Sequence, residues 1–226
     1  MDTYHPATVF SSIDHGGRYA FSNQPAIAQW NLVRFAETLL PLLGYDKEEA
    51  VTAAQDRIDA FPALFQKAIS TGYGRKIGME GMREGDLALV QDLLSVMANG
   101  EADFTLTFRA LCDAASDAGA NACVTALFTD PGPIGQWLSR WRERLGVDGR
   151  PLVETAEVMR TLNPVIIPRN HQVEKAIRAA VSDEDFAPFH RLVDALARPF
   201  EDRPDIEDLT SPPKPEEVVH QTFCGT

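Results

Sequence analysis

The spacing of apolar residues is the feature that most constrains the fold of this chain. From Pro25 onward, apolar side chains recur every three or four residues in one segment after another, which is the period of an amphipathic helix. No stretch alternates apolar and polar residues over more than a few positions, as a half-buried strand would. The sequence therefore predicts a mainly α-helical protein with almost no strand.

Residues that begin or end helices divide this pattern. A first helix is expected from Pro25 to Gly44, and a second begins at about Lys47, where Pro62 should produce a kink or two abutting helices. Ser182 and Asp185 resemble a capping box. The remaining helices are expected to open at Asp86, Asp103 and Asp130 and to occupy residues 120–129, 151–162, 171–180 and 182–197.

Composition separates three parts of the chain. Residues 1–24 are predicted to form an N-terminal loop segment, and residues 25–200 a helical lobe. Residues 201–226 form a tail with four prolines, seven acidic residues and two basic ones, so it carries −5 of the net charge of −12. We expect this acidic, proline-rich tail to be extended and partly mobile.

Charge and length limit the classes of partner. The chain has 226 residues, 21 of them Lys or Arg and 33 Asp or Glu. Such an acidic chain should be repelled by phosphate backbones and anionic lipid, so binding to nucleic acid is not expected. No apolar run is long enough for a membrane span, and the N-terminus lacks the features of a secretory signal. With three scattered cysteines, the simplest location is the reducing cytoplasm.

The glycine-rich segment 72–78 is the one candidate for a phosphate-binding loop. Its spacing fits neither G-x-G-x-x-G nor G-x-x-x-x-G-K-[ST], and the residues that precede it are helical rather than a strand. The spacing favours a flexible connection between helices, with Arg75 and Lys76 as solvated cations.

Nucleophile and metal patterns are weak. Ser11, Ser12, Asp14 and His15 are adjacent in one loop, whereas the members of a triad converge from separate elements, so we interpret them as turn residues. None of the five histidines forms an i, i+4 pair, and no C-x-x-C is present. We therefore predict no catalytic, cofactor-binding or metal-ligating residue.

The cysteines and tryptophans have simpler interpretations. Cys112 and Cys123 lie in apolar helical patterns and are predicted to be buried, inert thiols. Cys224 lies close to the end of the chain, is expected to be exposed, and is the one candidate for a redox role. Trp137 and Trp141, one helical turn apart, are expected in the core or in a partner groove.

Four segments together resemble the SelO (selenoprotein O) family. They are Phe10-Ser-Ser-Ile-Asp-His-Gly-Gly-Arg-Tyr-Ala-Phe21, Asn23-Gln-Pro-Ala-Ile-Ala-Gln-Trp-Asn-Leu32, Asn163-Pro-Val-Ile-Ile-Pro-Arg-Asn-His171 and Thr222-Phe-Cys-Gly-Thr226. The resemblance implies the helical C-terminal lobe of a kinase-like fold. Members of this family are called pseudokinases; they bind ATP with a divalent metal such as magnesium and transfer AMP to hydroxyl side chains of other proteins.

The motifs that carry that chemistry are missing from this chain. The resemblance implies a catalytic N-T-D-N motif, a metal-binding D-Y-G-P motif and an N-terminal nucleotide loop, and none of them occurs here. No catalytic or nucleotide-binding residue is therefore carried over, and neither ATP nor magnesium is expected to bind this chain alone. Cys224 resembles the selenocysteine or cysteine that some members carry near their C-terminus.

Two functions remain open. In the first, the chain is part of an adenylyltransferase and exposes an apolar surface, with Trp30 and Phe35 as contributors, where a missing N-terminal catalytic lobe docks. In the second, it is a helical protein-interaction module without nucleotide chemistry. Self-association through the same surface is a third outcome. The sequence does not decide whether this chain is itself an enzyme.

Overall fold

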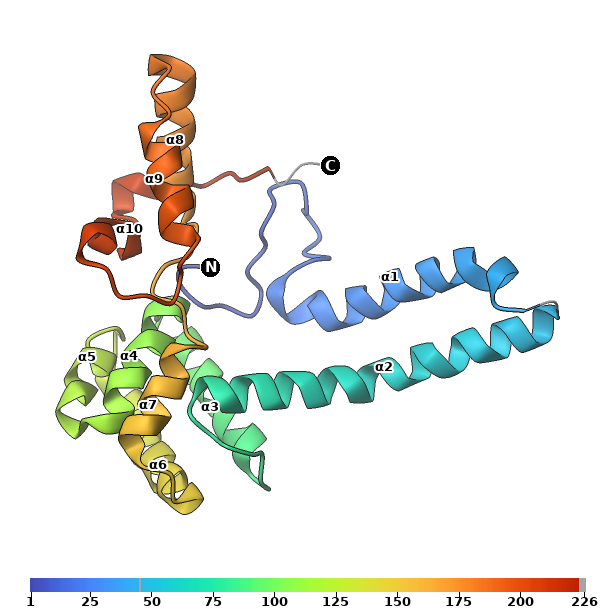
Figure 1. Cartoon of the computed structure of the whole chain (residues 1–226), viewed down its shortest axis with the longest axis horizontal. Helices are drawn as coiled ribbons and strands as arrows, with labels where there is room; N and C mark the ends of the chain where they lie inside the picture. The colour runs from blue at the N-terminus through green and yellow to red at the C-terminus, as the bar shows by residue number, and fades with distance from the viewer. Residues whose placement is uncertain (45, 224–226) are drawn as a thin grey trace. The chain divides into compact units, whose positions relative to one another are not determined.

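The computed structural model describes residues 1–44 and 46–223, and it confirms a mainly α-helical protein (Figure 1). In the described residues the only β-type pairing is an isolated antiparallel bridge between Thr3 and Asp103. The α-helices are α1 (Gln24–Leu39), α2 (Lys47–Lys76), α3 (Asp86–Asn99), α4 (Phe104–Ser116), α5 (Asn121–Thr125), α6 (Pro131–Asp148), α7 (Leu152–Arg160), α8 (Asn170–Asp183), α9 (Ala187–Leu196) and α10 (Glu207–Thr210).

Contacts divide the chain into two compact units. Unit 1 contains Met1–His5 and Tyr73–His220, and unit 2 contains Pro6–Gly72 with the chain end from Gln221. The boundaries predicted at residues 25 and 201 concern composition rather than contacts, and they stay a prediction.

Unit 1 has an extensive apolar core between helices α3, α4, α6 and α7. Trp137 and Trp141 are fully buried and stack with 5.5 Å between their ring centroids. Each indole N–H donates to a backbone carbonyl, that of Trp137 to Leu89 at 2.8 Å and that of Trp141 to Ile77 at 2.7 Å. Because both hydrogen bonds are satisfied internally, the two tryptophans are core residues rather than the wall of a partner groove.

A smaller apolar cluster lies at the start of the acidic tail, where short helical turns interrupt the extended course that was predicted. Residues 204–206 form a 3₁₀ turn, and α10 follows directly. Ile206 and Leu209 are buried there against Ile166 and Ala195. Pro204 suits this turn because it occupies a first-turn position, where no helical N–H is required.

Side-chain caps set several helix starts as predicted. The carboxylate of Asp103 accepts a hydrogen bond from the Leu106 N–H at 2.8 Å, and that of Asp130 accepts from the Gly132 N–H at 2.9 Å. Asp86, by contrast, is the first residue of α3 and not its cap.

The predicted capping box at Ser182 and Asp185 is wrong. Ser182 lies inside α8, which continues to Asp183 and ends at Glu184 in the left-handed conformation. Asp185 instead accepts a hydrogen bond from the Ala187 N–H at 2.9 Å, so it acts alone before α9.

Unit 2 contains α1 and the part of α2 up to Gly72, but almost no core. Among its described residues, only Ala20 and Ala50 are buried, and α1 has no buried residue at all. Helix α2 is one continuous helix of 30 residues with Pro62 in its interior, so of the two expected alternatives, a kink or two abutting helices, the second does not occur. The helix tolerates the proline by giving up one backbone hydrogen bond.

Candidate functional site

The glycine-rich segment is a helix terminus rather than a phosphate loop. Helix α2 continues through Gly72 and Gly74 to Lys76, and Gly78 adopts a positive φ of 85°. The Met79 N–H donates to the Gly74 carbonyl at 2.9 Å, and the Gly78 N–H donates to the Arg75 carbonyl at 3.1 Å. This is the Schellman arrangement that ends a helix. Its amide groups are therefore already used, and the C-terminal end of a helix dipole repels anions.

The expectation of a flexible connection is also wrong for this segment, and of the two cations expected to be solvated Arg75 is exposed but Lys76 is not. Ile77, Gly78 and Met79 are buried, and Lys76 is only partly exposed. The Lys76 ammonium lies 4.7 Å from the centre of the Phe108 ring and 3.4 Å from the Leu162 carbonyl oxygen. This segment is packed into unit 1.

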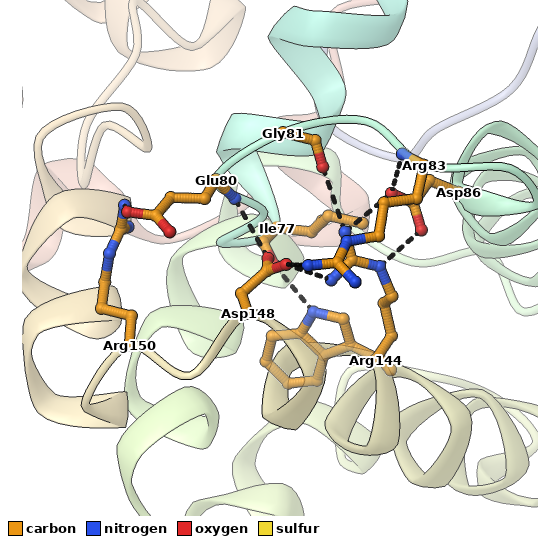
Figure 2. A network of polar contacts seen from close by, with 9 residues as sticks. Ile77, Glu80, Gly81, Arg83, Asp86, Arg144, Asp148 and Arg150 are labelled. Carbon is orange, nitrogen blue, oxygen red and sulfur yellow. Dashed lines mark hydrogen bonds and ion pairs between the residues drawn. The ribbon is translucent and has the colours of Figure 1, made fainter.

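A network of buried charges fixes the loop between α2 and α3 (Figure 2). The Arg144 guanidinium of α6 contacts Asp86 at 2.6 Å and Asp148 at 2.8 Å. Both carboxylates are almost fully buried, with 3% and 7% of their side-chain surface exposed. Arg83 reaches Asp148 from the loop at 3.0 Å, and the Glu80 N–H donates to the same carboxylate at 3.3 Å.

The pKa values of the two aspartates follow from this pairing. Burial raises the pKa of Asp86, but hydrogen bonds from Arg144 and from the Arg83 N–H, with the Arg144 charge, lower it below its usual value. The same balance of burial against Arg144 and the Glu80 N–H lowers the pKa of Asp148. Both carboxylates are therefore ionised and already neutralised by guanidinium groups, so the network is structural.

The segment Asn163–Asn170 is held by buried polar contacts at both of its ends. The Asn163 side-chain amide donates to the Lys76 carbonyl at 2.8 Å, and the Arg109 guanidinium donates to the Asn163 carbonyl at 3.0 Å. At the other end, fully buried Arg169 donates to the Asp103 carboxylate at 2.7 Å and also pairs with Asp2. These contacts give the segment one fixed course although it has no regular structure.

A pocket lies beside this segment. Its volume is about 340 Å³. It lies between the last turn of α2, the start of α4 and the Pro164–Pro168 stretch. The side chains that line it are Met1, Lys76, Phe104, Thr105, Phe108, Pro164, Ile167 and Pro168. No sequence pattern indicates this pocket, because its walls come from four separate parts of the chain.

The serine-rich loop near the N-terminus is a turn, as predicted. The Asp14 carboxylate accepts hydrogen bonds from the backbone N–H groups of Arg18 and Tyr19, both at 2.8 Å. The Ser12 hydroxyl accepts one from the Thr222 N–H at 3.0 Å. Asp14 thus organises the backbone, and His15 is exposed beside it.

The cysteines differ from one another. Cys112 is buried, as predicted, and burial raises the pKa of its thiol. Cys123 is exposed, so the prediction that it is buried is wrong: only Val124 of α5 is buried, and the neighbouring Cys123 points elsewhere on this short helix. Cys224, the candidate for a redox role, lies outside the described residues.

Within residues 1–44 and 46–223, no three His, Cys, Asp or Glu side chains are grouped so that they could hold a metal ion. In the same part of the chain, no helix is both long and apolar enough to cross a membrane.

Large apolar side chains are exposed on α1 of unit 2. Trp30 is 47% exposed, Phe35 is 58% exposed, and Leu32 between them is exposed as well. The Arg18 guanidinium lies over the Trp30 ring at 4.3 Å from its centre. We call Trp30, Leu32 and Phe35 the α1 apolar surface.

Comparison with known proteins places the chain in a family. A family model described as "Protein adenylyltransferase SelO" matches residues 1–197. The chain belongs to the SelO family. It is 53% identical over all 226 residues to a "Protein nucleotidyltransferase YdiU" of Bradyrhizobium diazoefficiens. Proteins of the same name from Rhizobium etli and Nitrobacter hamburgensis are 53% and 51% identical over the same length.

This SelO chain spans less than half the length of those relatives. The whole of this chain is aligned, but the aligned region is only 46% of the Bradyrhizobium protein and 45% of the Rhizobium protein. Within the described residues, the buried carboxylates of Asp86 and Asp148 are paired with Arg144, and that of Asp103 is paired with Arg169.

Proposed function

We propose that this chain is the C-terminal helical part of a SelO-type protein adenylyltransferase, which transfers AMP from ATP to hydroxyl side chains of other proteins. The observation that carries the proposal is the SelO match over residues 1–197 in a chain of less than half the relatives' length. ATP and magnesium belong to the remainder of such a protein, and the cytoplasm is the compartment that supplies them.

The chain alone is expected to be inactive in this chemistry. Transfer of AMP needs metal ions and cationic groups that stabilise phosphate charge in a preorganised site. The net charge of −12 opposes binding of a polyanion. The glycine-rich helix terminus also turns carbonyl groups, not amides, toward its open end.

The small core of unit 2 supports the proposal that another part of the protein packs on it. Its described residues bury only two alanines, whereas a folded unit of this size normally buries several large apolar side chains. The exposed side chains of the α1 apolar surface would be covered if another part of the protein packed on them. We propose that the occupant of this surface is the remaining part of the SelO protein.

An assay of AMP incorporation tests the activity. The chain alone, the full-length Bradyrhizobium relative and the chain mixed with the remainder of that relative are incubated with labelled ATP and magnesium. We expect labelled protein with the full-length relative and with the mixture, and none with the chain alone. Robust magnesium-dependent labelling by the chain alone would contradict the proposal that the nucleotide site lies in the remainder of the protein.

Hydrogen exchange tests the docking surface. We expect α1 amides to exchange much faster than those of α3, α4 and α6 in the chain alone, and to slow when the remainder is added. A Trp30→Ser/Phe35→Ser double variant should lose that protection. Val147→Ser and Val153→Ser, at exposed positions of unit 1, are the matched controls.

The alternative is a helical interaction module that uses the same surface without nucleotide chemistry. The specific observation that favours it is the exposure of Trp30, Leu32 and Phe35 on α1. Dye binding and sizing of the chain alone distinguish the cases. A monodisperse monomer that binds no dye would count against both functions, because each requires an exposed apolar surface. An oligomer that dissociates to monomers in the Trp30→Ser variant would indicate self-association.

A redox role for Cys224 also stays a proposal. Native-state thiol titration tests it, with Cys123→Ser as the background because Cys123 is exposed. We expect one rapidly reacting thiol to remain in that variant. If only slow thiols remain, Cys224 is inaccessible and the role is lost.

A further inference from the structure

The pocket beside the Asn163–Asn170 segment combines an apolar lining with a single charged group. Most of its walls are carbon, from the rings of Phe104 and Phe108 and from Pro164, Ile167 and Pro168. Its volume of about 340 Å³ falls within the range of small-molecule sites. Sites of this kind hold an apolar ligand body and use a few polar groups to orient it.

Lys76 is the charged group of this pocket, and it has no acidic partner. Its ammonium contacts the Phe108 ring and the Leu162 carbonyl, and it forms no ion pair with any residue that the structure describes. Burial lowers the pKa of Lys76, which reflects the cost of keeping this cation away from water. Most arginines of this unit have a carboxylate partner, so an unpaired, half-buried ammonium stands out in a chain with 33 acidic residues.

The other polar features of the pocket act on an anion in both directions. Thr105 also lines the pocket. It is the second residue of α4, whose dipole places positive potential at that end, whereas the last turn of α2 contributes the negative end of its own dipole. The Asp103 carboxylate that caps α4 shares the Arg169 guanidinium with Asp2. The Lys76 ammonium is therefore the group on which attraction of an anion depends.

We propose that this pocket binds a carboxylate carried on a small apolar body, with the Lys76 ammonium as its counter-ion. An ammonium–carboxylate hydrogen bond in a partly dry site is charge-assisted and stronger than the carbonyl contact that Lys76 makes now. The carboxylate comes either from a free small molecule or from an acidic side chain of the remaining part of the protein. This proposal does not depend on AMP transfer.

The test compares phenylacetate with its neutral isostere phenylacetamide, titrated by NMR at pH 7 into the 226-residue chain. We expect phenylacetate to bind and phenylacetamide to bind at least tenfold more weakly. Lys76→Met should weaken phenylacetate binding at least tenfold, whereas Lys67→Met, at an exposed lysine of the same helix, should leave it unchanged. The acid–amide comparison needs no variant, so it stands even if Lys76→Met fails to fold.

Three results would overturn the proposal: no binding of phenylacetate, equal binding of acid and amide, or unchanged binding to folded Lys76→Met. Adding the remainder of the Bradyrhizobium relative then distinguishes the sources of the carboxylate. Displacement of phenylacetate assigns the natural carboxylate to the protein itself. Unchanged binding in the presence of the remainder assigns it to a free small molecule.

Discussion

At the scale of single residues, three glycines allow the effect of a positive φ to be distinguished from the effect of close packing around the Cβ position. Gly78 has φ 85°, and a Cβ there would meet the Thr155 Cγ2 atom at 2.7 Å and the Met159 sulfur at 2.9 Å. Gly85 has φ 88° but open space around the Cβ position, and Gly81 has open space without a positive φ. Each can therefore be compared with the other two.

Gly78→Ala should lower the free energy of unfolding by about 2–4 kcal/mol, from left-handed strain and overpacking together. Gly85→Ala should cost about 1 kcal/mol from conformation alone, and Gly81→Ala should be close to neutral. Urea denaturation of the three variants measures this order. Equal effects at Gly78 and Gly85 would mean that the close contacts do not matter.

Two arginines one turn apart on α6 give a second comparison. Arg144 pairs with buried Asp86, whereas Arg140 pairs with Asp92 at 2.8 Å on the surface. Arg144→Met removes the only guanidinium that pairs with Asp86 within the described residues and leaves Asp148 with Arg83 alone, so it should cost about 3–5 kcal/mol. Arg140→Met should cost about 0–1 kcal/mol, because solvent screens an exposed pair. Thermal unfolding of both variants checks this, and similar losses would show that the network in Figure 2 is no more than a surface pair.

At the scale of elements, Pro62 is the exception within the long helix α2. Its ring removes one N–H from the interior of a helix of 30 residues. Pro62→Ala should restore the hydrogen bond to the Ile58 carbonyl and stabilise α2 by up to about 3 kcal/mol. Pro41→Ala is the control, because Pro41 lies in the first turn of the 3₁₀ helix Leu40–Leu42, where proline costs little. Far-UV circular dichroism during thermal unfolding measures both, and a loss of helix in Pro62→Ala would contradict this account.

The helix termini show why some element boundaries were predictable and others were not. Asp103 and Asp130 are caps whose hydrogen-bond partners lie two or three residues away, so local sequence was enough. The ends at Ser182 and Lys76 were misplaced. In both places the helix continues through residues with cap or glycine signals. At the end of α2, the residues that follow Lys76 are buried, whereas the last residues of α8 are exposed and packing does not explain its extension.

At the scale of the whole molecule, buried acids control the response of unit 1 to pH. The pKa values of Asp86 and Asp148 lie below 3.8 in the folded state, so their pairing contributes its full stability above that pH. The contribution is lost as the pH falls through the lowered folded values. We expect the free energy of unfolding to fall steeply below about pH 4.

The Arg144→Met variant isolates this effect. Without the guanidinium, burial raises the pKa of Asp86, so the stability difference between wild type and variant should shrink as the pH falls from 6 to 3. For Arg140→Met the difference should stay nearly constant. Urea midpoints at both pH values provide the measurement, and a difference that grows on acidification would contradict the assigned pairing.

The sequence by itself determined the helical class, the capped helix starts, the turn at Asp14 and the membership of the SelO family. These features depend on residues close together in the chain or on contiguous motifs, so they can be predicted from the local sequence. Only the tertiary structure decided that Lys76 is half-buried beside a pocket, that Arg144 and Arg169 pair with buried aspartates, and that α1 has no buried residue. Those properties arise from residues up to 167 positions apart, and no local period records which distant side chain shields a charge from water.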